Sequence, residues 1–557
     1  SVAGTTGYDF AAHVGGLLVD ADAEHPLDRV WRRFIGRRLD PDRVLVEAKL
    51  RIMDHRLSSE LLMLATELNR ISESDPATRD YTLASLRRAL REVVAAFPVY
   101  RTYVADDGPG EEDRRFVDWA VSRARGRMVA AEPSVLEFVR RVLLLELTTV
   151  DTSVQLDFVR RFEQYTGPVM AKGLEDTTFY IYHRLACLNE VGSEPHRFGV
   201  SPAAFHHLCR ERLRRWPHAM LATATHDTKR SEDVRARIAV LSEVPDEWAS
   251  RLARWSRVNR RRTRTVDGEQ APSRNDRYLL YQTLVGSWPR PAPVEEELAA
   301  YRDRITAYMV KAAREASIHT SWLNPDPAYE DALAGFVVAI LDEGGRFLPE
   351  LESFVARVER PGIVNALSQL LLRLTAPGVP DTYQGTELWD LSLVDPDNRR
   401  PVDWDRRRRL LGELGRLDTM ADERRAAVAD LLRSWPDGRV KMHVLRCALG
   451  LRKRCPGLFR DGDYEPLEAT GEQAQRVVAF ARRAEGDEIL VVVSQLTAPL
   501  CGDGFPLGAV WADTAVDQPP GSVTWRDELT GREHRTADGL ALAEVFADLP
   551  VALLVRR

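Results

Sequence analysis

The stretch from Met220 to Arg237, MLATATHDTKRSEDVRAR, constrains the fold of this chain more than any other. The apolar run from Met220 to Ala224 predicts a buried strand, and an arginine-rich helical segment follows His226 and Asp227. A carboxylate therefore stands where a strand ends and a helix begins. In a parallel α/β barrel such side chains converge on the catalytic mouth. The alternative is a helix N-cap, which is the commoner role for an Asp in this position.

A second candidate segment follows the short apolar run at residues 168–171. It carries Lys172 and Glu175, which we expect at the end of a strand. The two side chains could instead form an ordinary surface pair at the start of a helix.

A third candidate segment, residues 393–404, is dense in proline, Asp and Asn, which predicts a fixed loop. A fixed loop with carboxylate, amide and guanidinium groups can hold sugar hydroxyls at set angles, although DPDN is also a plain turn sequence. The candidate ligand-binding side chains in it are Asp397, Asn398 and Arg399.

Several stretches together resemble the α-amylase superfamily of glycoside hydrolases, in the long form of the maltooligosyl trehalose synthases. The segment THDTKRSEDVRAR is similar to the fourth signature of that superfamily. The others run in the family's order: GTTGYDF, TELNRI, FPVYRTY, GPVMAKGLEDTTFY, LNEVG, DRYLLYQTLVGSWP and PGVPDTYQGTELWDLSLVDPDNRRPVDW. A lone HDT is a weak signal, whereas this ordered set covers nearly the whole chain.

The resemblance implies an intramolecular transglycosylation. The reducing-end α-1,4 linkage of a maltooligosaccharide would become an α,α-1,1 linkage, as in trehalose biosynthesis, without a metal or organic cofactor. It also implies a functional partnership with a maltooligosyl trehalose trehalohydrolase. In this family the Asp of the HD signature steadies the positively charged transition state, which makes Asp227 the catalytic candidate. The implied substrate contacts are His226, Arg230, Lys172, Glu175, Tyr8, Asp9, Asp397, Asn398 and Arg399.

Two further carboxylates are expected from the chemistry of retaining glycosidases, a nucleophile and a general acid. The chain has neither a G-x-R-x-D motif directly after an apolar, strand-like run nor a Glu-bearing strand before GTTGYDF. We therefore expect it to match the C-terminal part of a longer enzyme and to be inactive alone. Another possibility is that Asp9 or Glu175 partners Asp227 in a rearranged site. The alternative functions are a non-catalytic glucan-binding remnant and an amylase-type hydrolase or glucanotransferase.

The predicted fold is α/β, a partial (β/α)8 TIM-type barrel with a large helical insertion and a C-terminal antiparallel β-sandwich. The expected divisions are a barrel strand segment at 1–20, the insertion at 21–165, the rest of the barrel at 166–455 and the β domain at 456–557. Alternating apolar residues predict strands at 476–481, 488–494, 523–526 and 551–555. A further short strand is predicted over residues 3–10, and helices are predicted from residues 276–285 and 295–317.

The insertion shows a helical pattern. One apolar stripe is predicted from residues that recur at intervals of four and three: Leu57, Leu61, Leu64, Leu68 and Ile71.

Composition excludes several classes of partner. A net charge of −6 argues against general nucleic-acid binding, and no apolar run is long enough to span a membrane. The five cysteines are widely spaced without a C-x-x-C pair, so we expect neither a disulfide framework nor a metal site, and a cytoplasmic location fits best.

Overall fold

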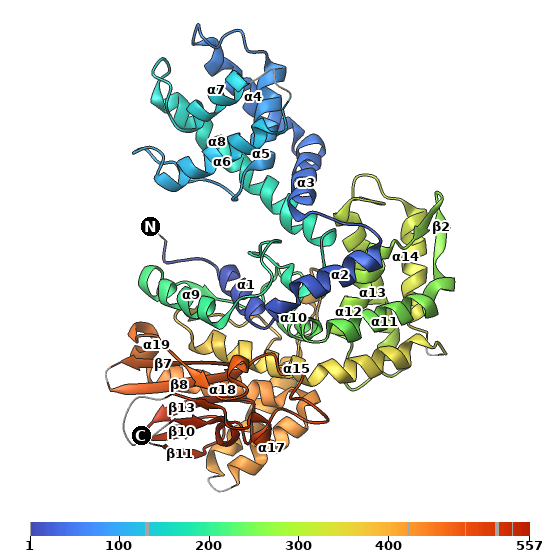
Figure 1. Cartoon of the computed structure of the whole chain (residues 1–557), viewed down its shortest axis with the longest axis vertical. Coiled ribbons are helices and arrows are strands. Elements are labelled where there is room, and N and C mark those ends of the chain that lie inside the picture. Colours follow the sequence, from blue (N-terminus) through green and yellow to red (C-terminus); the bar gives the residue numbers. More distant parts are fainter. Residues whose placement is uncertain are drawn as a thin grey trace. The chain divides into compact units, whose positions relative to one another are not determined.

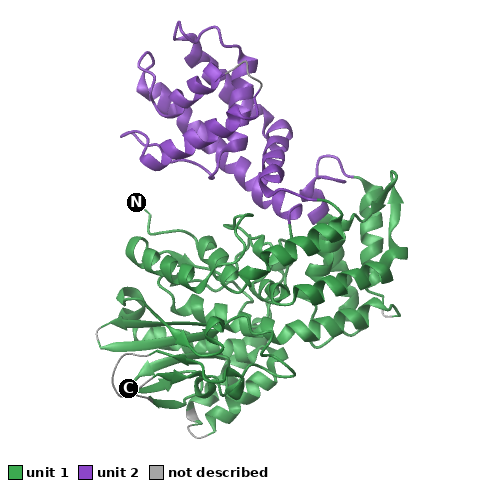
Figure 2. Cartoon of the chain, viewed as in Figure 1, with its two compact units in different colours: residues 1–37, 183–311, 326–557 green, residues 38–182, 312–325 purple. Residues whose placement is uncertain are grey.

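The computed structural model describes residues 2–128, 133–342, 344–420, 423–484, 486–517, 523–536 and 539–557. The chain forms two compact units (Figure 2). Unit 1 comprises residues 1–37, 183–311 and 326–557, and unit 2 comprises residues 38–182 and 312–325.

Unit 2 is built from helices around its own apolar core (Figure 1). The stripe predicted at four- and three-residue spacing is confirmed within α4 (Ser58–Glu73), where Leu61, Leu64, Leu68 and Ile71 are buried. Its first member, Leu57, precedes the helix and is only half-buried. The helices are α3 (Pro41–His55), α4 (Ser58–Glu73), α5 (Leu83–Ala96), α6 (Glu111–Arg125), α7 (Pro133–Leu143) and α8 (Thr152–Met170).

Unit 1 is organised around α10 (Glu232–Ala239), a helix whose residues are all buried. Two neighbouring helices approach it closely at glycines. A Cβ at Gly286 would lie 2.7 Å from a side-chain carbon of Ile238, and one at Gly362 would lie 3.0 Å from Cα of Arg237. Both close contacts are possible only because glycine has no side chain. The helices packed here are α12 (Arg274–Ser287) and α15 (Phe347–Thr375).

The helices predicted from residues 276–285 and 295–317 are confirmed as α12 and α13 (Glu295–Ala316). The other helices and the small hairpin of unit 1 before its C-terminal sheets are α1 (Tyr8–Leu17), α2 (Glu24–Ile35), α9 (Pro202–Arg215), α11 (Pro245–Asn259), β2 (Arg264–Val266), β3 (Glu269–Ala271), α14 (Pro327–Ile340), α16 (Trp404–Gly415), α17 (Arg424–Arg433), α18 (Arg439–Arg454) and α19 (Pro456–Asp461).

A short parallel pair of strands lies beside α10. Strand β1 (Met220–Leu221) pairs with β4 (Val379–Pro380), which follows α15 after a break at Pro377 and Gly378. The strand predicted at the start of MLATATHD is therefore confirmed, although it is shorter than expected. The segments that follow the two strands leave the pair at the same end, because the strands run parallel.

The strand predicted over residues 3–10 is wrong. Residues 4–7 lie beside β1, where the Met220 N–H donates to the Thr5 carbonyl at 3.1 Å, and α1 begins at Tyr8. Gly7 makes this turn possible with a left-handed φ of 94°, and a Cβ there would lie 2.6 Å from the backbone N of Ala222. The segment is thus an extended stretch and a turn that lead into a helix, with Asp9 in the first turn of the helix and Phe10 on its buried face.

The C-terminal strands form two antiparallel sheets, which confirms the predicted antiparallel architecture. The large sheet has the order β11-β10-β13-β8-β7-β5, and the small one β12-β9-β6. Alternate residues of β7 and β8 face opposite sides. One set shares a core with the small sheet, and the other packs with residues of α15 and α18. The elements are β5 (Glu465–Leu467), β6 (Ala469–Thr470), β7 (Val477–Ala484), β8 (Asp487–Ser494), β9 (Ala515–Val516), β10 (Val523–Asp527), β11 (Glu533–Thr536), β12 (Leu540–Ala541), α20 (Leu542–Val545) and β13 (Val551–Arg556).

Within the described ranges, none of the helices combines the length and the apolar character that crossing a membrane requires.

Candidate active site at the end of the parallel strands

Asp227 lies in a turn between β1 and α10, with about half of its side chain exposed. Its Oδ2 atom accepts a hydrogen bond from the Tyr8 hydroxyl at 3.2 Å and lies 3.2 Å from Nε2 of His226. The N-cap of α10 is Ser231, whose hydroxyl accepts from the Val234 N–H at 3.4 Å. The helix-cap alternative for Asp227 is therefore wrong, and its carboxylate is accessible to a ligand.

Asn398 holds the backbone of the turn that carries Asp227, residues 225–228, which is called the acidic turn below. Its side-chain amide donates to the carbonyl oxygen of His226 at 2.9 Å, and its own carbonyl accepts from the Tyr383 hydroxyl at 3.2 Å. Tyr383 follows β4, so the segments after both parallel strands meet at this point. Asn398 is 8% exposed. It therefore positions the turn, and sequence reasoning had given it only a direct role in sugar binding.

Asp397 anchors the same loop and does not face solvent freely. Its two oxygens each accept from Arg304 at 2.8 Å, and one also accepts from the Leu393 N–H at 2.8 Å. Burial raises the pKa of Asp397, but the Arg304 guanidinium outweighs it, and the pKa lies below its ordinary range. Arg399 is half exposed and pairs with Asp395 at 2.6 Å. Of this pair of predicted contacts, Arg399 is the more accessible.

Asp9 is committed to an ion pair within unit 1. It pairs with Arg212 of α9 at 3.0 Å and accepts from the Thr5 hydroxyl at 2.7 Å. Burial raises the pKa of Asp9, yet Arg212 and Thr5 outweigh it and the pKa is lowered. These partners keep the group ionised and orient it, and its neighbour Tyr8 is the residue that reaches Asp227.

Arg230, predicted to bind substrate, is 1% exposed. Its guanidinium donates to the Tyr308 hydroxyl at 2.8 Å and to the Ala186 carbonyl at 3.3 Å. This geometry makes Arg230 a support of the segment behind the acidic turn, and its direct contact with substrate stays a prediction.

Lys172 and Glu175 belong to unit 2 and do not follow a strand, which corrects the sequence interpretation. They lie in a π-helical turn, Ala171–Glu175, that continues α8. The helix extends this far because buried residues recur at helical spacing up to Met170, and Pro168 is accommodated inside it. Lys172 pairs with Asp176 at 2.6 Å, and Glu175 accepts a hydrogen bond from the Tyr100 hydroxyl.

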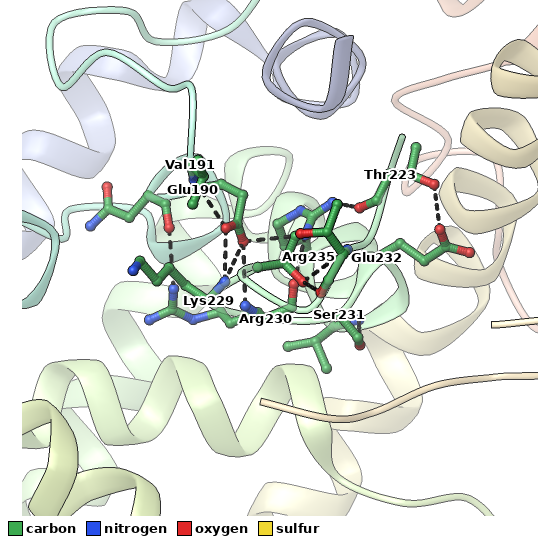
Figure 3. A network of polar contacts seen from close by, with 12 residues as sticks. Glu190, Val191, Thr223, Lys229, Arg230, Ser231, Glu232 and Arg235 are labelled. Atoms are coloured by element: carbon green, nitrogen blue, oxygen red, sulfur yellow. Dashed lines mark hydrogen bonds and ion pairs between the residues drawn. The ribbon is translucent and has the colours of Figure 1, made fainter. Parts of the chain in front are cut away.

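Glu190 is the residue that sequence reasoning missed most clearly. Figure 3 shows its carboxylate beside the backbone of Lys229 and Arg230 and the side chain of Arg235. It accepts from the Lys229 N–H at 2.8 Å, from the Arg230 N–H at 3.3 Å and from the Arg235 guanidinium at 3.2 Å. Glu190 is 2% exposed and fixes the chain directly after the acidic turn. Its only sequence signal was its place in the LNEVG motif.

A second buried charge cluster holds the N-terminal turn of α10. The ammonium group of Lys441, on α18, lies 2.7 Å from Glu232 and 2.8 Å from Asp233. Burial raises the pKa of both carboxyl groups, but Lys441 and Arg373 outweigh it at Glu232, whose pKa is lowered. At Asp233, burial and the neighbouring Glu232 prevail and the pKa is raised. The cluster therefore fixes the helix that follows the acidic turn.

The chain was compared with known proteins. No family model matches it. A Mycobacterium tuberculosis protein provisionally named maltooligosyl trehalose synthase is 38% identical over 556 residues, which is 100% of this chain and 63% of the relative. The solved structure of the maltooligosyltrehalose synthase from Arthrobacter ramosus matches with a TM-score of 0.81 at 37% identity, over 100% of this chain and 64% of that one.

Along its whole length this chain is similar to maltooligosyl trehalose synthases. A further solved maltooligosyl trehalose synthase matches with a TM-score of 0.74 at 28% identity, over 100% of this chain and 63% of that one. The resemblance inferred from the sequence motifs is thereby confirmed, together with an amylase-like fold that carries helices and a C-terminal antiparallel sheet. The chain spans 63% of the length of the curated relative, a share that fits the expectation of a partial match.

Proposed function

We propose that this chain is part of a maltooligosyl trehalose synthase, which converts the reducing-end α-1,4 linkage of a maltooligosaccharide to an α,α-1,1 linkage. The observation that carries the proposal is the match along all of this chain to proteins of that name. The position of Asp227 supports it, since this carboxylate stays accessible at the end of a parallel strand pair.

Asp227 serves as the carboxylate that binds the reacting sugar and stabilises the positive charge of the oxocarbenium-like transition state. Tyr8, whose hydroxyl donates to Oδ2, fixes the orientation of the carboxylate, and His226 lies beside it as a further hydroxyl-binding group. Lys172, Glu175 and Arg399 remain proposed substrate contacts.

The nucleophile and the general acid come from the part of the longer relatives that this chain does not match. The glycosyl-enzyme then waits while the released glucose turns over and attacks through its anomeric hydroxyl. This step requires a site that excludes water, because water would otherwise intercept the intermediate. The same proposal includes a partial barrel fold for this chain and a cytoplasmic location. It also includes a trehalohydrolase that consumes the product.

A chimera tests the proposal. This chain would replace the matching segment of the Arthrobacter ramosus synthase, and the hybrid would be incubated with maltohexaose. We expect loss of reducing ends without release of glucose, and loss of most of that turnover in Asp227→Asn with the fold retained. Equal turnover in Asp227→Asn would contradict the assigned role.

The 557-residue chain alone provides the comparison. We expect no loss of reducing ends, because the nucleophile and the general acid are proposed to come from a part of the relatives that this chain does not match. If the isolated chain converts maltohexaose, the proposal of an incomplete site is wrong. If neither the chain nor the chimera converts it while both bind it, the non-catalytic glucan-binding alternative is supported.

A further inference from the structure

A cavity of about 680 Å³ lies in unit 1 and shares no lining residue with the acidic turn. Its walls come from Arg237 of α10, residues 289–291 after α12, residues 388, 389 and 391, the start of α16 and the turn at 434–437. This volume is within the range of roughly 300 to 1,000 Å³ that is common for small-molecule sites. Neither the transglycosylation nor the buried charge clusters require such a cavity.

Tryptophan rings form part of the wall. Trp389 and Trp435 both line the cavity, with ring centroids 6.4 Å apart at an angle of 66°. The indole N–H of Trp389 donates to the Trp435 carbonyl at 2.5 Å, which fixes its ring. Trp404, 46% exposed, packs against the lining residue Arg407 with the guanidinium 5.9 Å from the ring centre. Rigid aromatic faces of this kind suit the apolar faces of sugar rings.

Hydrogen-bonding groups of both kinds stand next to these rings. Arg406 donates to the Asp437 carbonyl at 3.2 Å and has further N–H groups to offer. The Asp403 carboxylate accepts from the Arg406 N–H at 2.9 Å through one oxygen. Ser434 also lines the cavity. Sugar hydroxyls both donate and accept, so this mixture matches them.

Six charged side chains line the cavity, and three of them are paired with an opposite charge nearby. Arg290 pairs with Glu359 at 2.7 Å and Arg407 with Glu387 at 2.9 Å. Asp437 is likewise paired, with Arg439 at 2.7 Å. The Asp403 carboxylate in the same wall would repel a phosphate or carboxylate ligand. The aromatic rings and the mixture of donors and acceptors favour a neutral polyhydroxyl ligand, and the guanidinium groups of Arg237 and Arg406 make an anionic ligand the competing outcome of the test.

We propose that this cavity is a second binding site for a neutral oligosaccharide, separate from the site at Asp227. The choice of an α-glucan as its ligand rests on the proposed function, whereas the preference for a neutral sugar rests on the lining alone.

The test is calorimetric titration of the whole 557-residue chain with maltotriose. The two cavity variants are Arg406→Gln and Trp389→Phe, and the matched control is Arg409→Gln, an exposed arginine on α16 outside the lining. We expect Arg406→Gln to weaken binding by about tenfold, the loss of a charged hydrogen bond. The control should bind like the parent chain.

The Asp227→Asn variant separates this site from the catalytic proposal. Maltotriose binding that persists in Asp227→Asn and weakens in Arg406→Gln supports the second site, whatever the outcome of the chimera experiment. Binding that is unchanged in both cavity variants, or no binding by the folded chain, overturns it. Glucose 6-phosphate that binds more tightly than maltotriose, and depends on Arg406, overturns the neutral class of ligand.

Discussion

Asp227 and Glu232 are two carboxylates five residues apart in the same stretch, and their surroundings differ completely. The Asp227 side chain is 55% exposed and contacts a tyrosine hydroxyl and a histidine ring. The Glu232 side chain is 1% exposed, lies 2.7 Å from the Lys441 ammonium group and accepts a hydrogen bond from Thr223. The difference teaches that residue type and spacing do not separate a carboxylate for chemistry from one for stability.

The buried carboxylates share one physical requirement. An ionised group removed from water loses solvation, so a cation or several N–H groups must replace it. Lys441 does this for Glu232 and Asp233, and backbone N–H groups with Arg235 do it for Glu190. Asp227 needs no such replacement, because it keeps its contact with solvent.

The largest effect is expected from Lys441→Met. Removal of the ammonium group leaves Glu232 and Asp233 buried without their cation, which we expect to destabilise the chain by about 3 to 5 kcal/mol. Urea unfolding measures the change, and Lys453→Met, at an exposed position of the same helix, is the control. Equal stability of the two variants would contradict the role of the cluster.

Glu190→Gln should have the next largest effect on stability. The amide keeps one acceptor oxygen but loses the charge shared by two N–H groups and Arg235, at a cost of about 1 to 3 kcal/mol. The control is Glu194→Gln, whose native side chain is 68% exposed. In the chimera, Glu190→Gln should also lower turnover, since the segment after Asp227 loses its anchor. Unchanged stability and turnover would show that Glu190 neither stabilises the fold nor positions the segment after Asp227.

Glu243 extends the comparison to the pH dependence of stability. Its carboxyl group is buried and is bound mainly by the backbone. One oxygen accepts from the Ala498 N–H at 2.8 Å, and the other lacks a hydrogen-bond partner within the described residues. Burial raises the pKa of Glu243 from 4.5 to about 8. The folded chain therefore holds this proton where the unfolded chain has lost it, and stability falls as pH rises from 4.5 to 8.

Replacement by glutamine mimics the protonated form and removes this pH dependence. Between pH 5 and pH 8, Glu243→Gln should gain at least about 2 kcal/mol relative to the parent chain. Urea unfolding at several pH values measures the difference. A constant difference across this range would show that the group does not titrate on unfolding.

A smaller effect on stability is expected from Asn398→Ala. Loss of the amide leaves the His226 carbonyl without its donor, which should cost about 1 kcal/mol. In the chimera we expect a larger proportional loss of turnover, because the acidic turn is no longer fixed. The experiment compares unfolding and turnover in one variant. A loss of stability without a loss of turnover would show that Asn398 does not position Asp227.

The sequence predicted what local patterns determine. Apolar runs and alternation located β1, α12, α13 and the strands of the C-terminal sheets. The strand at residues 3–10 was wrong because the left-handed turn at Gly7 depends on its contact with Ala222, far along the chain. The short apolar run at residues 168–171 was interpreted as a separate strand, whereas it continues the helical pattern of α8. The position of Lys172 at a strand end was therefore predicted wrongly.

Contacts between distant residues could not be predicted in the same way. Glu190 lies 39 residues before Lys229, and Lys441 lies 208 residues after Asp233. Nothing in a local pattern indicates that these groups meet. The rarity of lysine was a usable signal, since the chain has only six and Lys441 is fully buried. The accessible Asp227 was identified because its motif is contiguous.

The most direct test of the account is the free energy of unfolding of Asp227→Asn beside that of Glu232→Gln, measured in urea at neutral pH. We predict a change within about 0.5 kcal/mol for Asp227→Asn, as for an exposed side chain without a structural role. Glu232→Gln should lose more than about 2 kcal/mol, because Lys441 and Asp233 are left with an altered buried cluster. A comparable loss in Asp227→Asn would show that this carboxylate serves the fold, and would contradict the central claim.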